Sequence, residues 1–193
     1  MSNALLLLQQ QVGSPAKSAP PIANPWQFWT VETLASVTQC PAQGIADAWP
    51  TIYAALNERG IATQAICAGV IATIAIETAS TFKPVKEAFW FDDAWRQANL
   101  RYYPWYGRGY IQLTWQTNYS NYGKALDVDL LTDPEVAMQP DVAARIIAEF
   151  FVQSKAAEAA AQQNWPETRR RVQGGHDGLD RLVRIVTGLG QPG

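Results

Sequence analysis

Apolar residues recur at helical spacing along most of the chain, and glycines and prolines separate the segments in which they do so. Segment 42–58 places its large apolar residues on one stripe and is followed by Gly60, a residue that commonly ends helices. Segment 64–77 follows the capping residue Thr63 and is apolar on nearly every face, which predicts a helix buried in the core. Further helices are expected at 31–37, at 141–163, from Pro166 and at 179–187, and Pro134 and Pro140 suit first turns.

Strand patterns are scarce in comparison. The best candidate is segment 110–114, where apolar and polar residues alternate. The sequence therefore predicts a mainly α-helical domain with at most a small β-hairpin or sheet.

The first 25 residues differ from the rest of the chain. Residues 13–25 hold four prolines among small residues, which is typical of a linker or a surface arm. We therefore expect an N-terminal arm over 1–25 and one folded domain over 26–190. The apolar run at 4–8 is shorter than the core of a signal peptide, and no stretch approaches the ~20 apolar residues of a membrane span. We expect no export signal and no stable insertion into a membrane.

Composition narrows the possible chemistry. The 193 residues carry 15 Lys and Arg against 17 Asp and Glu, a net charge of -2, whereas nucleic-acid binders carry a basic excess. A single histidine and two cysteines argue against a His-rich metal site, a Ser-His-Asp triad and a disulfide framework. Catalysis would fall to carboxylates, hydroxyls and amides, with no metal or organic cofactor.

Two glutamates are the first candidates for that chemistry. Glu77 ends the apolar helix, where desolvation disfavours the charged carboxylate, so we expect a raised pKa of the kind a general acid needs. A helix-end glutamate turned toward water is the alternative. Glu87 follows ten residues later, beyond the helix breaker Pro84. Two carboxylates in different surroundings are the minimum for cleaving a glycosidic bond, although Asp92 and Asp93 compete for the second role.

The segment WYGRGYIQLTWQTNY at 105–119 is the most distinctive in the chain. Gly107 and Gly109 indicate a backbone that turns tightly or lies against another part of the chain. The alternation places Gln112 and Thr114 on one side, and amides and hydroxyls beside aromatic rings are typical of sugar-binding sites. An amide network that only fixes a loop is the alternative. The substrate-binding residues expected here are Trp105, Tyr106, Arg108, Gln112 and Asn118.

The segment QGGHDGLDR at 173–181 is a glycine-rich turn that leads into a helix. No Lys-Ser/Thr pair follows the glycines, so the segment is not a phosphate-binding loop. His176 fits a turn residue better than a catalyst. Arg181 is either a carboxylate partner in a cleft or a surface charge.

The blocks YGRGYIQLTWQTNY and GKALDVDLLTDPEVAMQPDVAARIIAEFF resemble glycoside hydrolase family 19, which contains plant-type chitinases and many bacteriophage endolysins. The resemblance covers about 28–186, and GRG-x-IQLT-x-x-x-NY is its most specific part. It implies a lysozyme-like helical fold with two lobes around a cleft, and an inverting hydrolysis with one acid and one base.

The resemblance also implies roles for individual residues. By position, Glu77 resembles the acid of the family and Glu87 the base that activates water. The other matches are Thr114 with a hydroxyl that holds that water, Gln112 and Asn118 with substrate-binding amides, and Arg181 with the arginine after the Gly-Gly turn.

Some positions depart from the family pattern. Ile76 stands where the family commonly has His, and Gln173, which we keep in the substrate-binding set, stands where Asn usually precedes Gly-Gly. The segment between Glu77 and Glu87 is short beside plant chitinases, and their disulfide set is missing. Both features are similar to those of phage lysins.

We expect an endolysin-type peptidoglycan hydrolase that cleaves the β-1,4 bond between N-acetylmuramic acid and N-acetylglucosamine. It would be a monomer made in the host cytoplasm, acting on the bacterial cell wall after release. The alternative is a chitinase acting on β-1,4-linked N-acetylglucosamine polymer. A third hypothesis is an inactive wall-binding module, which the presence of both glutamates disfavours.

Overall fold

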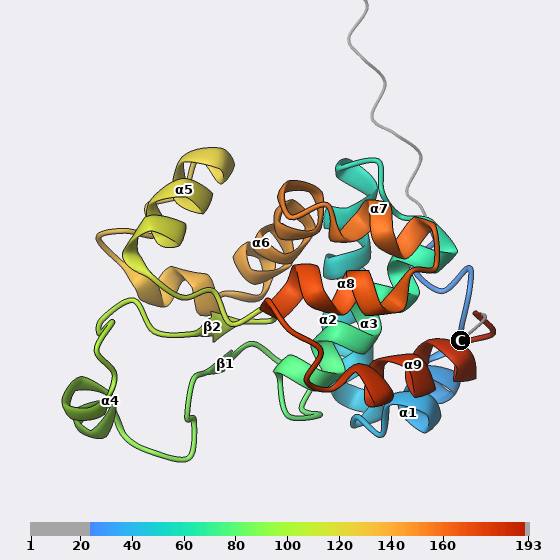
Figure 1. The fold of residues 1–193 in the computed structure, drawn as a ribbon, viewed down its shortest axis with the longest axis horizontal. Coiled ribbons are helices and arrows are strands. Elements are labelled where there is room, and N and C mark those ends of the chain that lie inside the picture. The colour runs from blue at the N-terminus through green and yellow to red at the C-terminus, as the bar shows by residue number, and fades with distance from the viewer. Residues whose placement is uncertain (1–23, 192–193) are drawn as a thin grey trace, which may run out of the picture.

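The computed structural model describes residues 24–191, so nearly all of the expected N-terminal arm lies outside the described residues. The chain is mainly helical, as the hydrophobic pattern predicts (Figure 1). The helices are α1 (Val31–Thr38), α2 (Ala42–Glu58), α3 (Gln64–Glu77), α4 (Asp93–Asn99), α5 (Gln116–Leu126), α6 (Pro140–Gln153), α7 (Ala156–Ala161), α8 (Trp165–Gln173), α9 (Leu179–Gly188) and the 3-10 helix η1 (Pro134–Met138).

Helix α3 forms the centre of the larger part of the molecule. The Thr63 side chain accepts a hydrogen bond from the backbone N–H of Ile66 at the start of the helix. Residues 66–75 are all buried, and α3 packs against α1, α7, α8 and α9. A helix that is apolar on every face is stable in water only when other helices surround it, and α3 is surrounded in this way.

A small antiparallel sheet joins β1 (Val85–Lys86) to β2 (Arg108–Gly109), with Val85 opposite Gly109 and Lys86 opposite Arg108. The predicted strand at 110–114 is wrong. The backbone of Gln112 has a φ of 53°, in the left-handed region, so this segment folds back as a turn and Leu113 bridges to Arg108. The expectation of at most a small sheet holds for the described residues.

The long helix expected at 141–163 is divided into α6 and α7. Lys155 has a φ of 61°, which no α-helix accommodates, and the carbonyl of Phe150 accepts a hydrogen bond from the Ser154 hydroxyl. The Ser154 oxygen in turn accepts from the backbone N–H of Ala156. The break lets α7 turn back and pack against both α3 and α8.

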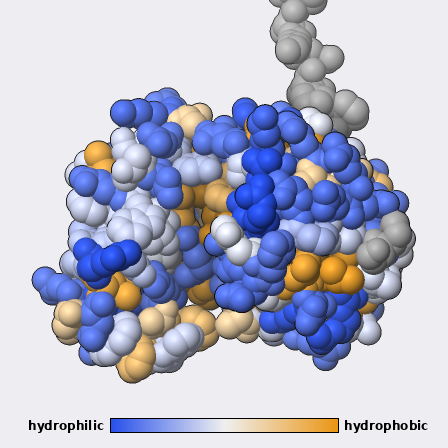
Figure 2. Space-filling view, in the orientation of Figure 1, coloured by the Kyte–Doolittle hydropathy of each residue, from blue (hydrophilic) through white to orange (hydrophobic). Residues whose placement is uncertain are grey.

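The elements form two parts with a hollow between them. Figure 1 shows α4 and α5 on one side of the molecule, α1, α3, α7, α8 and α9 on the other, and the sheet between them. Figure 2 shows that the surface is hollowed between these parts. Helix α6, which packs against α2 and α5, connects them.

Three further properties concern residues 24–191. They contain no helix with the length and apolar character that crossing a bilayer requires. They bring together no group of His, Cys, Asp and Glu side chains able to hold a metal ion. Cys40 and Cys67 are both buried and unbridged, and burial raises the pKa of the Cys67 thiol to about 12.

The central position of α3 predicts a large effect of shortening one of its side chains. Ile71 is fully buried there, so Ile71→Ala should lower the free energy of unfolding by about 2–5 kcal/mol through lost burial and a residual cavity. Urea denaturation followed by circular dichroism measures the change. The matched control is Leu131→Ala, an exposed apolar side chain, and equal losses in the two variants would contradict the central role of α3.

Candidate active site

Glu77 is the last residue of α3 and is held by an arginine from α8. Its side chain is 17% exposed, and its Oε1 lies 2.5 Å from Nη1 of Arg169. The Arg169 guanidinium is buried, and its Nε donates to the carbonyl of Asp177 in the turn between α8 and α9. The carboxylate at the end of α3 is therefore fixed to α8 and, through Arg169, to the turn between α8 and α9, with one oxygen bound to a cation.

Arg169 is the site residue that sequence reasoning missed. Arg181, expected to be either a carboxylate partner or a surface charge, donates through Nη2 to Ser80 Oγ at 2.6 Å and to the carbonyl of Thr38 at 3.4 Å. The available signal was the Arg-Arg-Arg run at 169–171, of which only Arg169 faces the core. Gln173 donates at 3.2 Å to the carbonyl of Asp177 that Arg169 also binds, so it braces the same turn.

Glu87 directly follows β1, and both of its carboxylate oxygens accept hydrogen bonds. Oε1 accepts from the Tyr102 hydroxyl at 2.5 Å, and Oε2 accepts from the backbone N–H of Gly107 at 2.9 Å. The backbone N–H of Glu87 also donates to the carbonyl of Gly107 at 2.7 Å. Burial and the neighbouring carboxylate raise the pKa of Tyr102 to about 12, so the phenol remains a donor at neutral pH. Neutral groups thus hold Glu87, whereas a cation holds Glu77.

The two aspartates that compete with Glu87 have structural partners. Asp92 accepts from the backbone N–H of Trp95 at 2.8 Å and caps α4. Asp93 accepts from the hydroxyls of Tyr103 at 2.8 Å and Tyr106 at 3.1 Å, and the Tyr103 bond is the main reason that its pKa lies below the usual value. Asp92 thus serves as a helix cap, whereas Asp93 is held much as Glu87 is, and the assignment of the second carboxylate role to Glu87 stays a prediction.

The polar side chains of the 105–119 segment brace their own loop. The Gln112 amide donates to the carbonyls of Val85 at 3.0 Å and Gly109 at 3.3 Å. The Thr114 hydroxyl donates to the carbonyl of Gln112 at 2.8 Å, and the Asn118 amide donates to the carbonyl of Thr114 at 2.8 Å. Their roles toward a substrate stay predictions. Trp105 likewise lies on this loop, where its indole N–H donates to the carbonyl of Leu131 at 3.3 Å.

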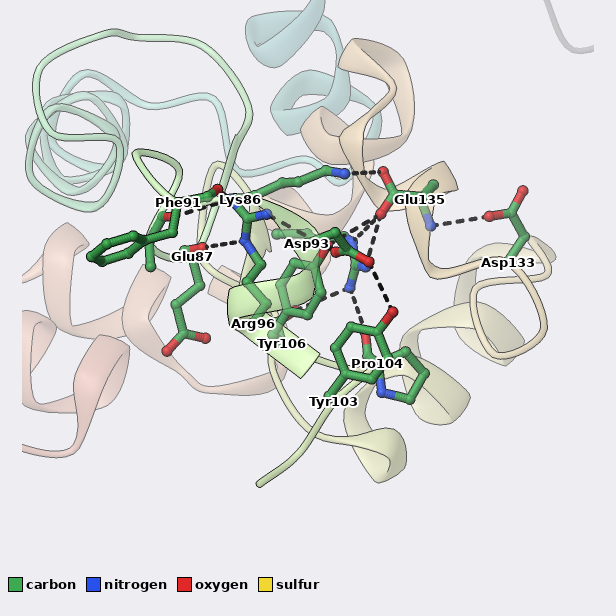
Figure 3. Close-up of polar contacts among 12 residues, drawn as sticks. Lys86, Glu87, Phe91, Asp93, Arg96, Tyr103, Pro104, Tyr106, Asp133 and Glu135 are labelled. Atoms are coloured by element: carbon green, nitrogen blue, oxygen red, sulfur yellow. Dashed lines mark hydrogen bonds and ion pairs between the residues drawn. The ribbon is translucent and has the colours of Figure 1, made fainter. Parts of the chain in front are cut away.

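Tyr106 and Arg108, both expected to bind substrate, lie in the interior, and Figure 3 shows Tyr106 beside Arg96. Both are buried, and the Arg108 guanidinium lies 3.6 Å from the centre of the Tyr106 ring. Arg108 donates to Oε1 of Glu135 through Nε at 3.0 Å and Nη2 at 2.8 Å. Both side chains therefore brace the loop in this structure, and their role toward a substrate stays a prediction.

Glu135 connects this loop to the sheet. Its second oxygen lies 2.8 Å from Nζ of Lys86, which precedes Glu87 in the chain. Partial burial raises the pKa of Glu135, but the hydrogen bonds and positive charges of Lys86 and Arg108 outweigh burial and hold the pKa below its usual range. This ion-pair network fixes β1 and β2 relative to η1, and with them the backbone that carries Glu87.

Part of this chain is similar in sequence to known chitinases. A model of the family described as chitinase class I matches residues 92–175. Endochitinase At2g43610 of Arabidopsis thaliana is 42% identical over 72 residues, which are 37% of this chain and 25% of that protein. Endochitinase A2 of Pisum sativum is 30% identical over 90 residues, 44% of this chain and 28% of that protein. The chain thus spans about a quarter of the length of these curated relatives.

Solved structures show the same fold over a larger share of the chain. Chitinase C from Streptomyces griseus HUT6037 superimposes with a TM-score of 0.58 at 21% identity, covering 84% of this chain and 78% of that one. A bacterial family 19 chitinase superimposes with a TM-score of 0.57 at 20% identity, covering 84% and 95%. The resemblance to glycoside hydrolase family 19 and its lysozyme-like helical fold is therefore confirmed. The family match begins after Glu87, so it includes the 105–119 segment but neither glutamate.

The ion pairs of Glu135 predict a stability that depends on pH in a defined direction. Because the pKa of Glu135 is lowered on folding, its contribution is complete above the unfolded value of about 4.3 and is lost as the pH falls through the folded value. Glu135→Gln should lower the melting temperature at pH 7 and reduce its further fall between pH 5 and pH 3. Circular dichroism melts at several pH values measure both effects. Glu58→Gln, on the exposed face of α2, is the control, and a pH profile of Glu135→Gln parallel to that of the unmodified protein would contradict the role of the network.

Proposed function

We propose that this protein is a glycoside hydrolase that cleaves β-1,4 bonds between N-acetylated sugars, with Glu77 as the general acid and Glu87 as the general base. The supporting observation is the contrast between the two carboxylates. Glu77 ends a helix of the larger part and is paired with Arg169, whereas Glu87 follows β1 on the other part and is held by neutral donors. Inverting glycosidases place two such groups ~6.5–9.5 Å apart on either side of the sugar, which leaves room for a water molecule.

The contacts of each glutamate leave open the oxygen lone pairs that its proposed role needs. Arg169 binds Oε1 of Glu77, and among the described residues no group donates to Oε2, which would carry the proton for the departing sugar oxygen. On the opposite face of the sugar, Glu87 would remove a proton from water as the water oxygen attacks the anomeric carbon. The bond between that carbon and the departing oxygen then breaks, and the proton of Glu77 completes the new hydroxyl.

Thr114 would help to hold that water. Its hydroxyl hydrogen is directed to the carbonyl of Gln112, so its oxygen lone pairs are left to accept a hydrogen bond from water. The amide of Gln112, two residues before Thr114, donates to the carbonyl of Val85, two residues before Glu87, and so links the two segments. The orientation of the attacking water would thus depend on the same loop that positions the base.

Chitin is the first substrate to test, because the similar proteins carry the names of endochitinases and chitinases. Peptidoglycan is the second, because the short segment between Glu77 and Glu87 and the unbridged cysteines are similar to those of phage lysins. Both polymers contain N-acetylated β-1,4-linked sugars, and the proposed chemistry is the same for both. If peptidoglycan is the substrate, we propose that the protein is made in a host cytoplasm and acts on the bacterial cell wall after its release.

The acid role predicts that Glu77→Gln abolishes hydrolysis, because the amide has no proton to donate to the departing oxygen. We expect a loss of about 10²–10⁴-fold or more in kcat with an unchanged circular dichroism spectrum. Release of reducing ends from colloidal chitin and from purified peptidoglycan measures the loss and distinguishes the two substrates. The matched control, Glu58→Gln, should retain full activity. Normal turnover by Glu77→Gln would remove Glu77 from the acid role, and no turnover of either polymer by the unmodified protein would favour a binding module.

The base role predicts that Glu87→Gln loses most activity while it retains substrate binding. The amide can still pack beside Tyr102 and Gly107, but it cannot accept a proton from the attacking water. We expect a lower kcat and an unchanged KM. Both are measured on the polymer that the unmodified protein cleaves. An unchanged kcat would shift the base role to Asp92 or Asp93.

A further inference from the structure

Three consecutive aromatic side chains next to Glu87 are exposed. Phe89 is 45% exposed, Trp90 69% and Phe91 42%, and we call these three residues the aromatic platform. In the described part of the chain, only Trp115 and Leu131 are comparably exposed large apolar side chains. A contiguous exposed apolar patch generally marks a binding surface, whereas single exposed apolar residues are ordinary.

The platform has a fixed backbone. Arg96 is buried beneath it and donates through Nε to the carbonyl of Glu87 at 2.8 Å, and through Nη2 to the carbonyls of Ala88 at 3.1 Å and Phe91 at 2.7 Å. Figure 3 shows Glu87 and Phe91 gathered at this guanidinium. The Phe91 ring also stacks on Trp95, with centroids 4.2 Å apart and an angle of 12° between the planes. The backbone of the platform and the Phe91 ring are therefore held in place before any ligand binds, which lowers the entropy lost on binding.

The charges near the platform favour an uncharged ligand. Asp92 follows Phe91 in the chain and Asp93 follows Asp92, and both carboxylates are fixed by hydrogen bonds. The charge of Arg96 is buried against backbone carbonyls and offers no contact to an anion at the surface. Asp93 lies 4.0 Å from Nη1 of Arg96, so this ion pair offers no free positive charge to an anionic ligand, whereas the apolar faces of neutral pyranose rings can stack on aromatic side chains.

We propose that the aromatic platform is a binding subsite for uncharged N-acetylated sugar units of the polymer, separate from the units at the two glutamates. This proposal rests on the proposed function, because it takes the same glycan as its ligand. Arg96 acts as a positioning residue, since it holds the backbone of Glu87 and the backbone of the platform through one guanidinium. A sugar stacked on the platform would thereby fix the register of the polymer relative to the base.

Binding without turnover tests the subsite. The full chain carrying Glu77→Gln is compared with the same chain carrying Trp90→Ala in addition, in equilibrium binding to colloidal chitin. We expect the second change to weaken binding about tenfold, the loss of one well-packed ring contact. The matched control adds Leu131→Ala to Glu77→Gln and should bind as Glu77→Gln does, and melting curves verify that all three proteins are folded.

The outcomes separate this subsite from the proposed function. Equal affinity of the Glu77→Gln chain with and without Trp90→Ala, or no affinity of either for chitin, overturns the subsite. Binding to phosphatidylglycerol vesicles that depends on Trp90, without an effect on chitin binding, overturns it in favour of a lipid surface. Chitin binding that depends on Trp90, in a protein whose unmodified form cleaves no glycan, supports the subsite and overturns the proposed function.

Discussion

The Arg108 guanidinium is buried between the 105–119 loop, α5 and η1, and it can be buried only because its donors find acceptors on all three. Nη1 donates to the carbonyl of Tyr106 at 3.4 Å and to the Tyr119 hydroxyl at 3.1 Å, and Nε and Nη2 bind Glu135. Nη1 also donates to the carbonyl of Pro104, just before the loop, at 2.8 Å. Removing a charge from water costs several kcal/mol, which a partly exposed carboxylate and well-aligned hydrogen bonds offset. The position of β2, and of Glu87 directly after the neighbouring strand β1, follows from this arrangement.

The glycines on either side of Arg108 are required by that close packing. A Cβ on Gly107 would lie 2.8 Å from Oε1 of Gln112 and 3.3 Å from Cβ of Glu87. Gly109 has a φ of 82°, and a Cβ there would lie 3.0 Å from the carbonyl of Ala137 in η1. One glycine therefore allows the loop to approach the candidate base, and the other allows it to approach η1.

Hydrophobic periodicity correctly predicted the helices that bury an apolar face, including α2, α3 and α9. It missed α4 and α5, because these helices are short or polar and depend on contacts with their neighbours. The break at Lys155 was also invisible, since helix-forming residues continue across it and the packing of α7 decides the conformation.

In the candidate site, too, the sequence predicted features that depend on local pattern and missed those that depend on how the helices pack. The sequence singled out both glutamates by residue type and by position relative to helix ends and breakers. It gave no means of choosing Arg169 over its neighbours, because the partner of Glu77 depends on which face of α8 packs against α3. The burial of Tyr106 and Arg108 was equally hidden, since a short motif does not reveal which side of a loop meets solvent.

Arg96 and Arg108 both donate hydrogen bonds to backbone carbonyls outside regular secondary structure. The segment between α3 and α5 contains little regular structure, so many of its buried carbonyls lack the partners that a helix or sheet provides. The guanidinium groups supply those partners, Arg96 for Glu87 and Phe91, and Arg108 for Pro104. A lysine could not replace either arginine, because a single ammonium cannot reach carbonyls and a carboxylate in one plane. Two arginines in the smaller part thus give an irregular chain the rigidity that α3 and its packed neighbours give the larger part, and a glycan bound between the two parts would meet fixed groups on both sides.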